Sequence, residues 1–221
     1  MRQSLLLVVL LGAAPAWPQP AGRLPVKDVV ARMQAYYDRI QDLKADFKQQ
    51  IKNPTTGRTK ESLGTVRLKK PGKMRWDYAK PEKKHFISDG QTLWVYEPED
   101  SQAFKQDLKG SNLSAAVTFL AGQGKLAAEF DFEATDAAKL GGAADYAVKL
   151  VPKRPSAQFK SIVLVLDPAT FQVKQSVVAT PDGGQSQVWF TGLEVNKKIP
   201  DTVFKFTPPP GTRVIVPPSP R

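Results

Sequence analysis

The chain has 221 residues with 32 basic and 21 acidic side chains, a formal net charge of +11, and no cysteine. Without cysteine the protein forms no disulfides, so its stability has to come from a hydrophobic core. The single histidine, His85, lies in an alternating strand pattern and is expected to be structural. We therefore expect neither a histidine-based catalytic triad nor a histidine-rich metal site.

The N-terminal residues have the pattern of a secretory signal peptide. Arg2 precedes an unbroken apolar run from Leu5 to Leu11, and small residues follow, so we expect residues 1–16 to be removed. The apolar run is too short to span a membrane, which takes about 20 residues. No cysteine follows the cut to carry acyl chains. The exported chain, with a formal charge of +10 once Arg2 is removed, is expected to be soluble.

A basic surface favours acidic partners or simply keeps a protein soluble. Both interpretations stay open, because the lysines are scattered rather than grouped in blocks. Nucleic acid is not expected as a partner, since the sequence contains no binding motif for it.

A Pro-rich spacer, residues 17–23, leads into the expected domain at residues 24–216, and a Pro-rich tail, residues 217–221, follows. Apolar residues from Val26 to Ile40 recur every three or four positions, which predicts an amphipathic helix. From Leu43 to Ile51 the period changes to two, which predicts a first strand.

Short alternating segments separated by turn sequences make up most of the remaining chain. The turns contain Gly, Pro or Asp, as hairpin connections do. With the first strand, these segments predict about eleven mostly antiparallel strands. The further predicted strands are residues 63–70, 73–78, 84–89, 91–98, 128–134, 145–153, 159–167, 172–180, 185–195 and 202–206.

A second predicted helix interrupts this series of strands. Residues 111–126 are mostly small or apolar, with Ser111 or Asn112 as the N-cap and Gly122 beyond the helix end. Two helices in an otherwise continuous sheet imply that they cover one of its faces. The predicted fold class is therefore α+β.

Few residues offer catalytic chemistry. Glu97 and Glu99, or Asp131 and Glu133, could form acid/base pairs, but their turn and lysine surroundings are typical of solvated residues. The glycine-containing segment at residues 122–125 lacks the spacing of a phosphate-binding loop. We expect no catalysis, no cofactor and no metal.

Aromatic and apolar side chains on the strands form the strongest remaining pattern. Such a pattern is either plain core or the lining of a ligand cavity. A curved sheet under a thin helical cover favours the cavity, because its concave side need not be filled by the protein's own side chains. The residues of the pattern are Phe47, Met74, Trp76, Trp94, Tyr96, Phe130, Phe132, Trp189 and Phe190.

Several motifs in a fixed order resemble the LolA family of periplasmic lipoprotein carriers. They are GTVRLKKPGKMRWDY, HFISDGQTLWVYEP, LSAAVTFLAG and FKFTPPPGTRV, and the resemblance covers residues 24–216. It implies an unclosed antiparallel β half-barrel of about eleven strands, covered by a helical lid and enclosing an apolar cavity for acyl chains. LolB-type receptors have a similar fold but are lipid-anchored, so the lack of cysteine favours the carrier.

The resemblance also implies which residues line the acyl-chain cavity. Strand alternation places Trp94 and Tyr96 on one face and Leu93 and Val95 on the other, and the first pair is taken as the inner one. The expected cavity residues are Phe47, Val66, Leu68, Met74, Trp76, Ile87, Trp94, Tyr96, Phe119, Leu120 and Phe190.

Lys70 occupies the position at which the family typically has an arginine that hydrogen-bonds to the lid. The resemblance therefore implies a lid contact at Lys70. An ammonium group lacks the planar fork of donors of an arginine, so a weaker contact is expected. The alternative is that Lys70 is a solvated lysine at a strand end.

The function implied by the resemblance is that of a monomeric, non-enzymatic carrier. It would take acylated lipoproteins from an inner-membrane ABC exporter and deliver them to the outer membrane, with a LolB-type receptor as a further candidate partner. Two alternatives remain: a periplasmic lipid or lipoprotein sensor, which generally has a second domain, and a polyanion-binding module that uses the basic surface.

Overall fold

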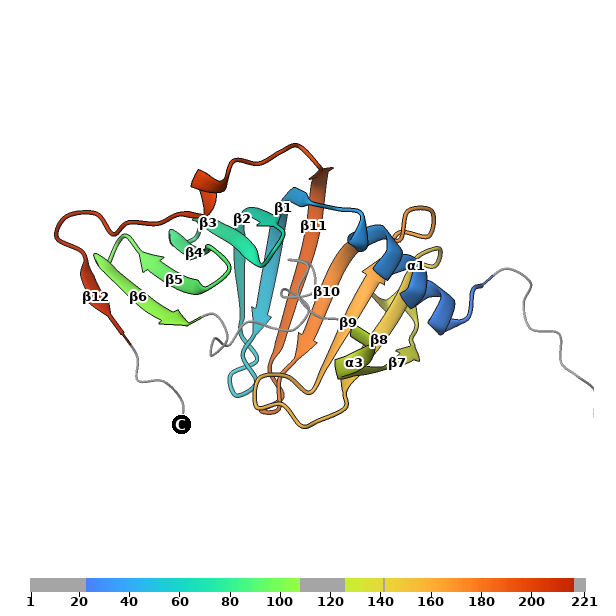
Figure 1. Ribbon diagram of the computed structural model, residues 1–221. Helices are drawn as coiled ribbons and strands as arrows, with labels where there is room; N and C mark the ends of the chain where they lie inside the picture. The colour runs from blue at the N-terminus through green and yellow to red at the C-terminus, as the bar shows by residue number, and fades with distance from the viewer. Residues whose placement is uncertain (1–22, 108–125, 141, 217–221) are drawn as a thin grey trace, which may run out of the picture.

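The computed structural model describes residues 23–107, 126–140 and 142–216. Its strands form a single open sheet in the order β12-β6-β5-β4-β3-β2-β1-β11-β10-β9-β8-β7 (Figure 1). The expected signal peptide, residues 111–125 of the second predicted helix, and the C-terminal tail lie outside the described residues. The strands are β1 (Asp42–Lys52), β2 (Thr59–Lys69), β3 (Lys73–Lys80), β4 (Lys84–Ser88), β5 (Thr92–Glu97), β6 (Gln102–Asp107), β7 (Phe130–Ala134), β8 (Tyr146–Pro152), β9 (Ser161–Leu166), β10 (Val173–Ala179), β11 (Gln185–Val195) and β12 (Arg213–Ile215).

The sheet consists of two antiparallel halves joined through β1. Strands β1 to β6 follow one another in space as they do in sequence, and so do β7 to β11. The pairing of β1 with β11 connects the halves, and the C-terminal β12 pairs in parallel with β6. The sheet is open, with β12 at one edge and β7 at the other. This arrangement confirms the predicted unclosed, mainly antiparallel half-barrel.

The strand assignment differs from the prediction in three places. The predicted last strand, residues 202–206, is largely a 3₁₀ helix, η3 (Asp201–Phe204), since these residues hydrogen-bond locally and to Arg75 rather than to a neighbouring strand. Strands β6 and β12 were not predicted, and they bring the described sheet to twelve strands. Their alternation is weak: β6 has only two apolar residues, and β12 is a three-residue edge strand.

Helix α1 (Val26–Asp38) is the predicted amphipathic helix, and it packs against β7 and β8 on what we call the inner face of the sheet (Figure 1). Its apolar side chains Val29 and Met33 are buried in the main core. At its C-terminal end, the backbone N–H of Val173 on β10 donates to Tyr37 Oη at 3.0 Å. The helix is therefore fixed to the sheet by both apolar packing and a buried hydrogen bond.

The main core is one continuous apolar layer on the inner face. It extends from Phe130 on β7, under α1, to Phe47 on β1 and on to Leu93 on β5. A much smaller cluster of Ala137 and Val165 lies apart from it, at the short 3₁₀ helix η2 (Ala137–Lys139). Neither α1 nor the short α3 (Leu126–Glu129), nor any other helix in the described part of the chain, is long and apolar enough to cross a membrane.

Candidate functional site

Five aromatic side chains form a connected cluster on the inner face, four of them in the half formed by β1 to β6 and Phe190 on the adjoining β11. The ring of Phe47 on β1 lies 4.9 Å from that of Trp76 and 4.9 Å from that of Tyr78, both on β3. The ring of Trp76 lies 6.1 Å from that of Phe190 on β11, and that of Tyr78 lies 5.7 Å from that of Phe86 on β4. These tilted and edge-on geometries are favourable for aromatic pairs.

Strand register brings these rings together. Phe47 is opposite Phe190 on one side and Gly64 on the other, and Trp76 is opposite Phe86. The position of Gly64 leaves room for the Phe47 ring, because a Cβ atom there would come within 2.7 Å of that ring. A glycine in this strand therefore allows an aromatic ring to lie close against the backbone.

Polar groups within the cluster are mostly paired inside the protein. Tyr78 Oη donates to Gln49 Oε1 at 2.9 Å, and Gln49 Nε2 donates to Ser186 Oγ at 3.0 Å. Burial raises the pKa of Tyr78 to about 12, so its hydroxyl group stays protonated at neutral pH. Trp76 is the exception: its buried Nε1–H has no acceptor among the described residues.

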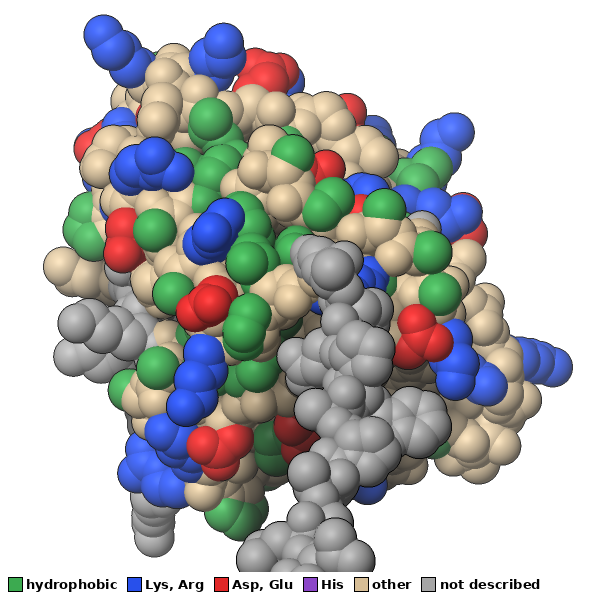
Figure 2. Space-filling model, turned by 90° about the vertical axis from the view of Figure 1, so that its right-hand side faces the viewer, with side chains coloured by type: hydrophobic (Ala, Val, Ile, Leu, Met, Phe, Trp, Pro, Cys, Tyr) green, Lys and Arg blue, Asp and Glu red, His purple; other side chains and the backbone are tan. Residues whose placement is uncertain are grey.

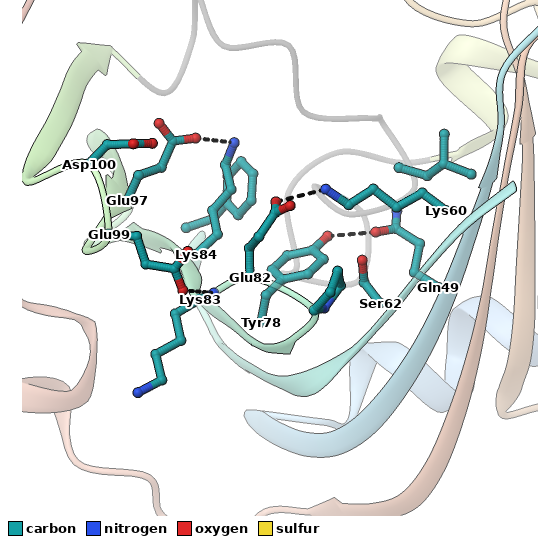
Figure 3. A pocket seen from close by; sticks show the side chains of 13 residues that line it. Gln49, Lys60, Ser62, Tyr78, Glu82, Lys83, Lys84, Glu97, Glu99 and Asp100 are labelled. Carbon is teal, nitrogen blue, oxygen red and sulfur yellow. Dashed lines mark hydrogen bonds and ion pairs between the residues drawn. The ribbon is translucent and has the colours of Figure 1, made fainter. Parts of the chain in front are cut away.

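A charged cleft of about 560 Å³ opens beside the aromatic cluster (Figure 3). Tyr78 and Phe86 belong to the cluster and also line the cleft. Ion pairs surround it, Lys84 Nζ to Glu97 Oε1 at 2.6 Å and Lys60 Nζ to Glu82 Oε2 at 2.7 Å. The hydrogen bond from Lys84 holds the pKa of Glu97 below its usual value. The cleft therefore joins a polar, ionised rim to an apolar floor.

A second cleft, of about 820 Å³, lies between α1, α3 and β7 at the other end of the apolar layer. Val30 and Phe130 belong to both this cleft and the main core, while Lys27 and Lys153 lie among the residues that line it. Figure 2 shows apolar side chains interspersed with charged ones on the side of the molecule that carries α1 and β7. The two clefts thus border opposite ends of one continuous apolar layer.

Six of the predicted cavity residues share the inner face. Val66 and Leu68 on β2 and Met74 on β3 are buried there beside the aromatic cluster. The residues that the structure brings together are Phe47, Val66, Leu68, Met74, Trp76 and Phe190. Phe119 and Leu120 lie outside the described residues.

The structure places the other three predicted cavity residues, Ile87, Trp94 and Tyr96, on the outer face. Leu93 and Val95 belong to the inner-face core instead, so the expected orientation of this strand was wrong. Trp94 and Tyr96 pack on the ring of Phe206, at 5.4 and 5.1 Å between ring centres. Strand alternation alone does not decide which face is the inner one. The outer face also has an apolar partner for these rings, because Phe206 of the C-terminal segment lies there.

Ion pairs on the outer face surround Asp77. Its carboxylate lies 2.9 Å from the guanidinium groups of Arg67 and Arg75 and 2.6 Å from His85 Nδ1. Burial alone would raise the pKa of Asp77, but hydrogen bonds from His85 and Arg75 lower it to about 2. Arg75 also donates to the carbonyl oxygen of Val203, so the network holds η3 against the sheet.

Lys70 contacts the end of α1. Its Nζ donates to the carbonyl oxygens of Tyr37 at 2.7 Å and Asp38 at 3.1 Å. A cation at a helix C-terminus satisfies free carbonyl groups and interacts favourably with the helix dipole. Lys70 is thus joined to a helix of the inner face, and a role in closing a lid stays a prediction.

The sequence-based choice missed Tyr78, Phe86 and Val95, which also contribute to the inner face. Tyr78 follows Met74 and Trp76 in the same alternation, so extending that pattern by one step would have found it. Phe86 and Val95 can be placed on the same face as Trp76 only when the strand register is known, because Phe86 is opposite Trp76 and Val95 is opposite Phe86.

The carboxylate pairs considered for catalysis include residues in ion pairs with lysines. Glu97 pairs with Lys84, and Glu133 Oε2 lies 2.9 Å from Lys149 Nζ. Among the described residues, no three His, Asp or Glu side chains are grouped as a metal site requires.

Comparison with known proteins agrees with this architecture. A family profile described as "Outer membrane lipoprotein carrier protein LolA" matches residues 38–207. The chain belongs to the LolA family. A protein of Dechloromonas aromatica named outer-membrane lipoprotein carrier protein is 27% identical over 186 residues, which cover 84% of this chain and 86% of the relative. A protein of the same name from Neisseria meningitidis serogroup B is 31% identical over 163 residues, covering 72% and 73%.

A crystal structure of an uncharacterized conserved protein from Thermus thermophilus has the same fold. It aligns with a TM-score of 0.56 at 12% identity and covers 86% of this chain and 98% of its own. The family and the names of the relatives support a role in carrying lipoproteins.

Proposed function

We propose that the protein is a periplasmic carrier that binds the acyl chains of lipoproteins on its inner face and moves them to the outer membrane. The observation that carries this proposal is the continuous apolar layer with a cleft at each end. The aromatic cluster in that layer provides flat apolar surface beside a polar rim. This combination suits an amphiphile that has a hydrocarbon tail and a hydrated head.

The energetics explain why such a carrier is needed. An acyl chain in water costs about 0.8 kcal/mol for each CH₂ group, so a lipoprotein does not cross an aqueous compartment unaided. Binding to a protein surface removes that cost without any chemical reaction. The proposed carrier is accordingly non-enzymatic, and it takes its cargo from an inner-membrane ABC exporter and gives it to the outer membrane, directly or through a LolB-type receptor.

The binding step is tested with a synthetic triacylated lipopeptide and the same peptide without acyl chains. Calorimetric titration of the purified protein is expected to show saturable binding of the lipopeptide only. Phe86→Ala removes a half-buried ring from the inner face and should weaken binding about tenfold. Phe206→Ala removes a half-buried ring from the outer face and serves as the matched control.

Equal loss of affinity in both variants would place the binding surface elsewhere. Lack of binding by the parent protein would contradict the carrier function itself. The transport step has its own assay, because a carrier should release newly made lipoproteins from spheroplasts into the medium. Fractionation and N-terminal sequencing test whether the protein is soluble in the periplasm and begins near Trp17.

Polyanion binding is the second candidate function, and ion pairs neutralise part of the basic surface that it would use. Lys44 is paired with Glu194, and Lys48 is paired with Glu61. Paired lysines present little free positive charge to a polyanion. Binding to heparin that falls steeply with salt, without any binding of the lipopeptide, would favour that alternative.

A further inference from the structure

Trp76 combines two properties that packing alone does not require. Its side chain is only 8% exposed and packs between Phe47 and Phe190 on the inner face. Its Nε1–H has no acceptor among the described residues. An indole nitrogen can only donate, and a buried donor without an acceptor destabilises the protein. A phenylalanine would provide an aromatic ring without that penalty.

The neighbouring polar groups make this exception clearer. Tyr78 Oη and Gln49 Nε2 both donate to groups within the protein, and Ser88 Oγ accepts from the N–H of Gly90 at 3.1 Å. Buried donors are normally satisfied, and one that lacks a partner on a proposed binding face is suited to a ligand. On the inner face, Trp76 is such a donor.

We propose that Trp76 Nε1–H donates a hydrogen bond to a carbonyl oxygen of the ester or amide that links an acyl chain to the cargo. This inference rests on the proposed carrier function and names the group that is recognised. The carbonyl is the polar group nearest the hydrocarbon, and an ester carbonyl only accepts, which complements a donor-only indole. Trp76 is therefore a specificity-determining residue for acyl lipids.

The position of Trp76 along β3 also fits the orientation of such a ligand. Tyr78 lies two residues further along the same strand face, at a rise of about 7 Å, and it lines the charged cleft of Figure 3. A lipid held by its carbonyl at Trp76 can place its polar head in that cleft. Its hydrocarbon then lies over the apolar layer of the inner face.

The test compares two lipids that differ only in the carbonyl: a short-chain diacyl glycerol ester and the dialkyl glycerol ether of equal chain length. Both are titrated calorimetrically, below the concentration at which they aggregate. The parent protein should bind the ester about 2- to 13-fold more tightly, the range expected for one net hydrogen bond. Trp76→Phe retains an aromatic ring, removes the N–H, and should bind ester and ether equally.

Trp94→Phe makes the same chemical change on the outer face, where Trp94 packs on Phe206, and should retain the preference for the ester. Trp76→Phe should also unfold at the same or a higher temperature than the parent when no lipid is bound, since it removes an unsatisfied donor. A second measurement does not depend on that variant: the ¹H–¹⁵N indole signal of Trp76 in the parent should shift downfield with the ester but not with the ether.

Each result decides the proposal. An equal affinity of the parent for ester and ether, a retained preference in Trp76→Phe, or an indole signal that responds alike to both lipids would overturn the role of Trp76. In all three cases the lipids still bind, so the carrier function would stand. Binding of neither lipid would overturn the carrier function and this inference together.

Discussion

The two halves of the inner face are covered differently and border different clefts. In the half formed by β7 to β11, aliphatic residues such as Leu150 and Leu164 pack beneath α1. The half formed by β1 to β6, which we call the aromatic half, carries four of the five rings of the aromatic cluster, contains internal hydrogen bonds, and borders the charged cleft. No helix among the described residues packs on that aromatic half as α1 does on the other.

If the inner face binds acyl chains as proposed, this difference separates stability from binding. Side chains packed tightly beneath a helix stabilise the fold. Aromatic rings beside a polar rim offer contact area to a ligand at little cost in side-chain entropy. Substitutions in the two halves should therefore have different consequences, and the following four predictions test this.

The largest effect is expected in the α1-covered half. Leu164 is fully buried, so Leu164→Ala should lower the free energy of unfolding by about 3 kcal/mol, because it leaves a cavity beneath the helix. Urea unfolding measures the change. Leu63, which is 39% exposed, gives the control, and Leu63→Ala should lower it by less than about 1 kcal/mol. Equal losses would mean that the core of this half is not tightly packed around Leu164.

A smaller loss of stability, together with a loss of binding, is expected at Gly64 in the aromatic half. In Gly64→Ala the new Cβ would meet both the Phe47 ring and the carbonyl oxygen of Asp77. Overpacking of this kind costs about 2 kcal/mol and should move the ring. Near-ultraviolet circular dichroism and lipopeptide titration detect both changes. Gly142→Ala, whose Cβ would lie 3.6 Å from its nearest neighbour, should alter neither.

The outer face behind the aromatic half should be sensitive to acid. The pKa of Asp77 is lowered from 3.8 to about 2 in the folded protein, so its contribution to stability is present above pH 3.8 and is lost as the pH falls through 2. The free energy of unfolding should decline by about 2 kcal/mol over that window. The Asp77→Asn variant should be less stable at neutral pH. Its free energy of unfolding in urea should also depend less on pH below about pH 4. An equally steep loss of stability below about pH 4 in the variant would exclude Asp77 as the source of the acid sensitivity.

The smallest effect is expected where Lys70 joins the halves. Lys70→Ala removes two hydrogen bonds to the C-terminus of α1 and should lower the free energy of unfolding by about 1 kcal/mol. Lys70→Arg should retain or increase stability and slow the uptake of an apolar fluorescent probe, if the contact also restrains access to the inner face. Identical stability and uptake in the parent and both variants would show that Lys70 is a solvated strand-end lysine.

The sequence predicts local structure well and the choice of face poorly. The spacing of Val26, Val29, Val30 and Met33 predicts α1, and turn residues bound most of the strands. The family resemblance led to Trp94 and Tyr96 as inner-face residues, although strand alternation alone fits either face. Their partner Phe206 lies more than a hundred residues away in sequence, and only the folded chain brings it to the outer face.

The same limit applies to the site. Met74 and Trp76 could be placed on a common face from their spacing alone, and the structure agrees. The missing acceptor of Trp76, the helix-end contact of Lys70 and the charged cleft depend on distances between strands that sequence patterns do not contain. Strands β6 and β12 were missed because a short edge pairing needs little apolar alternation.

The short parallel pairing of β12 with β6 has a consequence for self-association. An open sheet has two edges, and an unpaired edge can add a strand from another molecule. Residues 213–215 occupy the edge at β6, which leaves β7 as the other outermost strand of the described sheet. That strand is only five residues long and carries the exposed acids Asp131 and Glu133, both of which discourage edge-to-edge growth into aggregates. The described sheet thereby limits the routes by which its own backbone could polymerise.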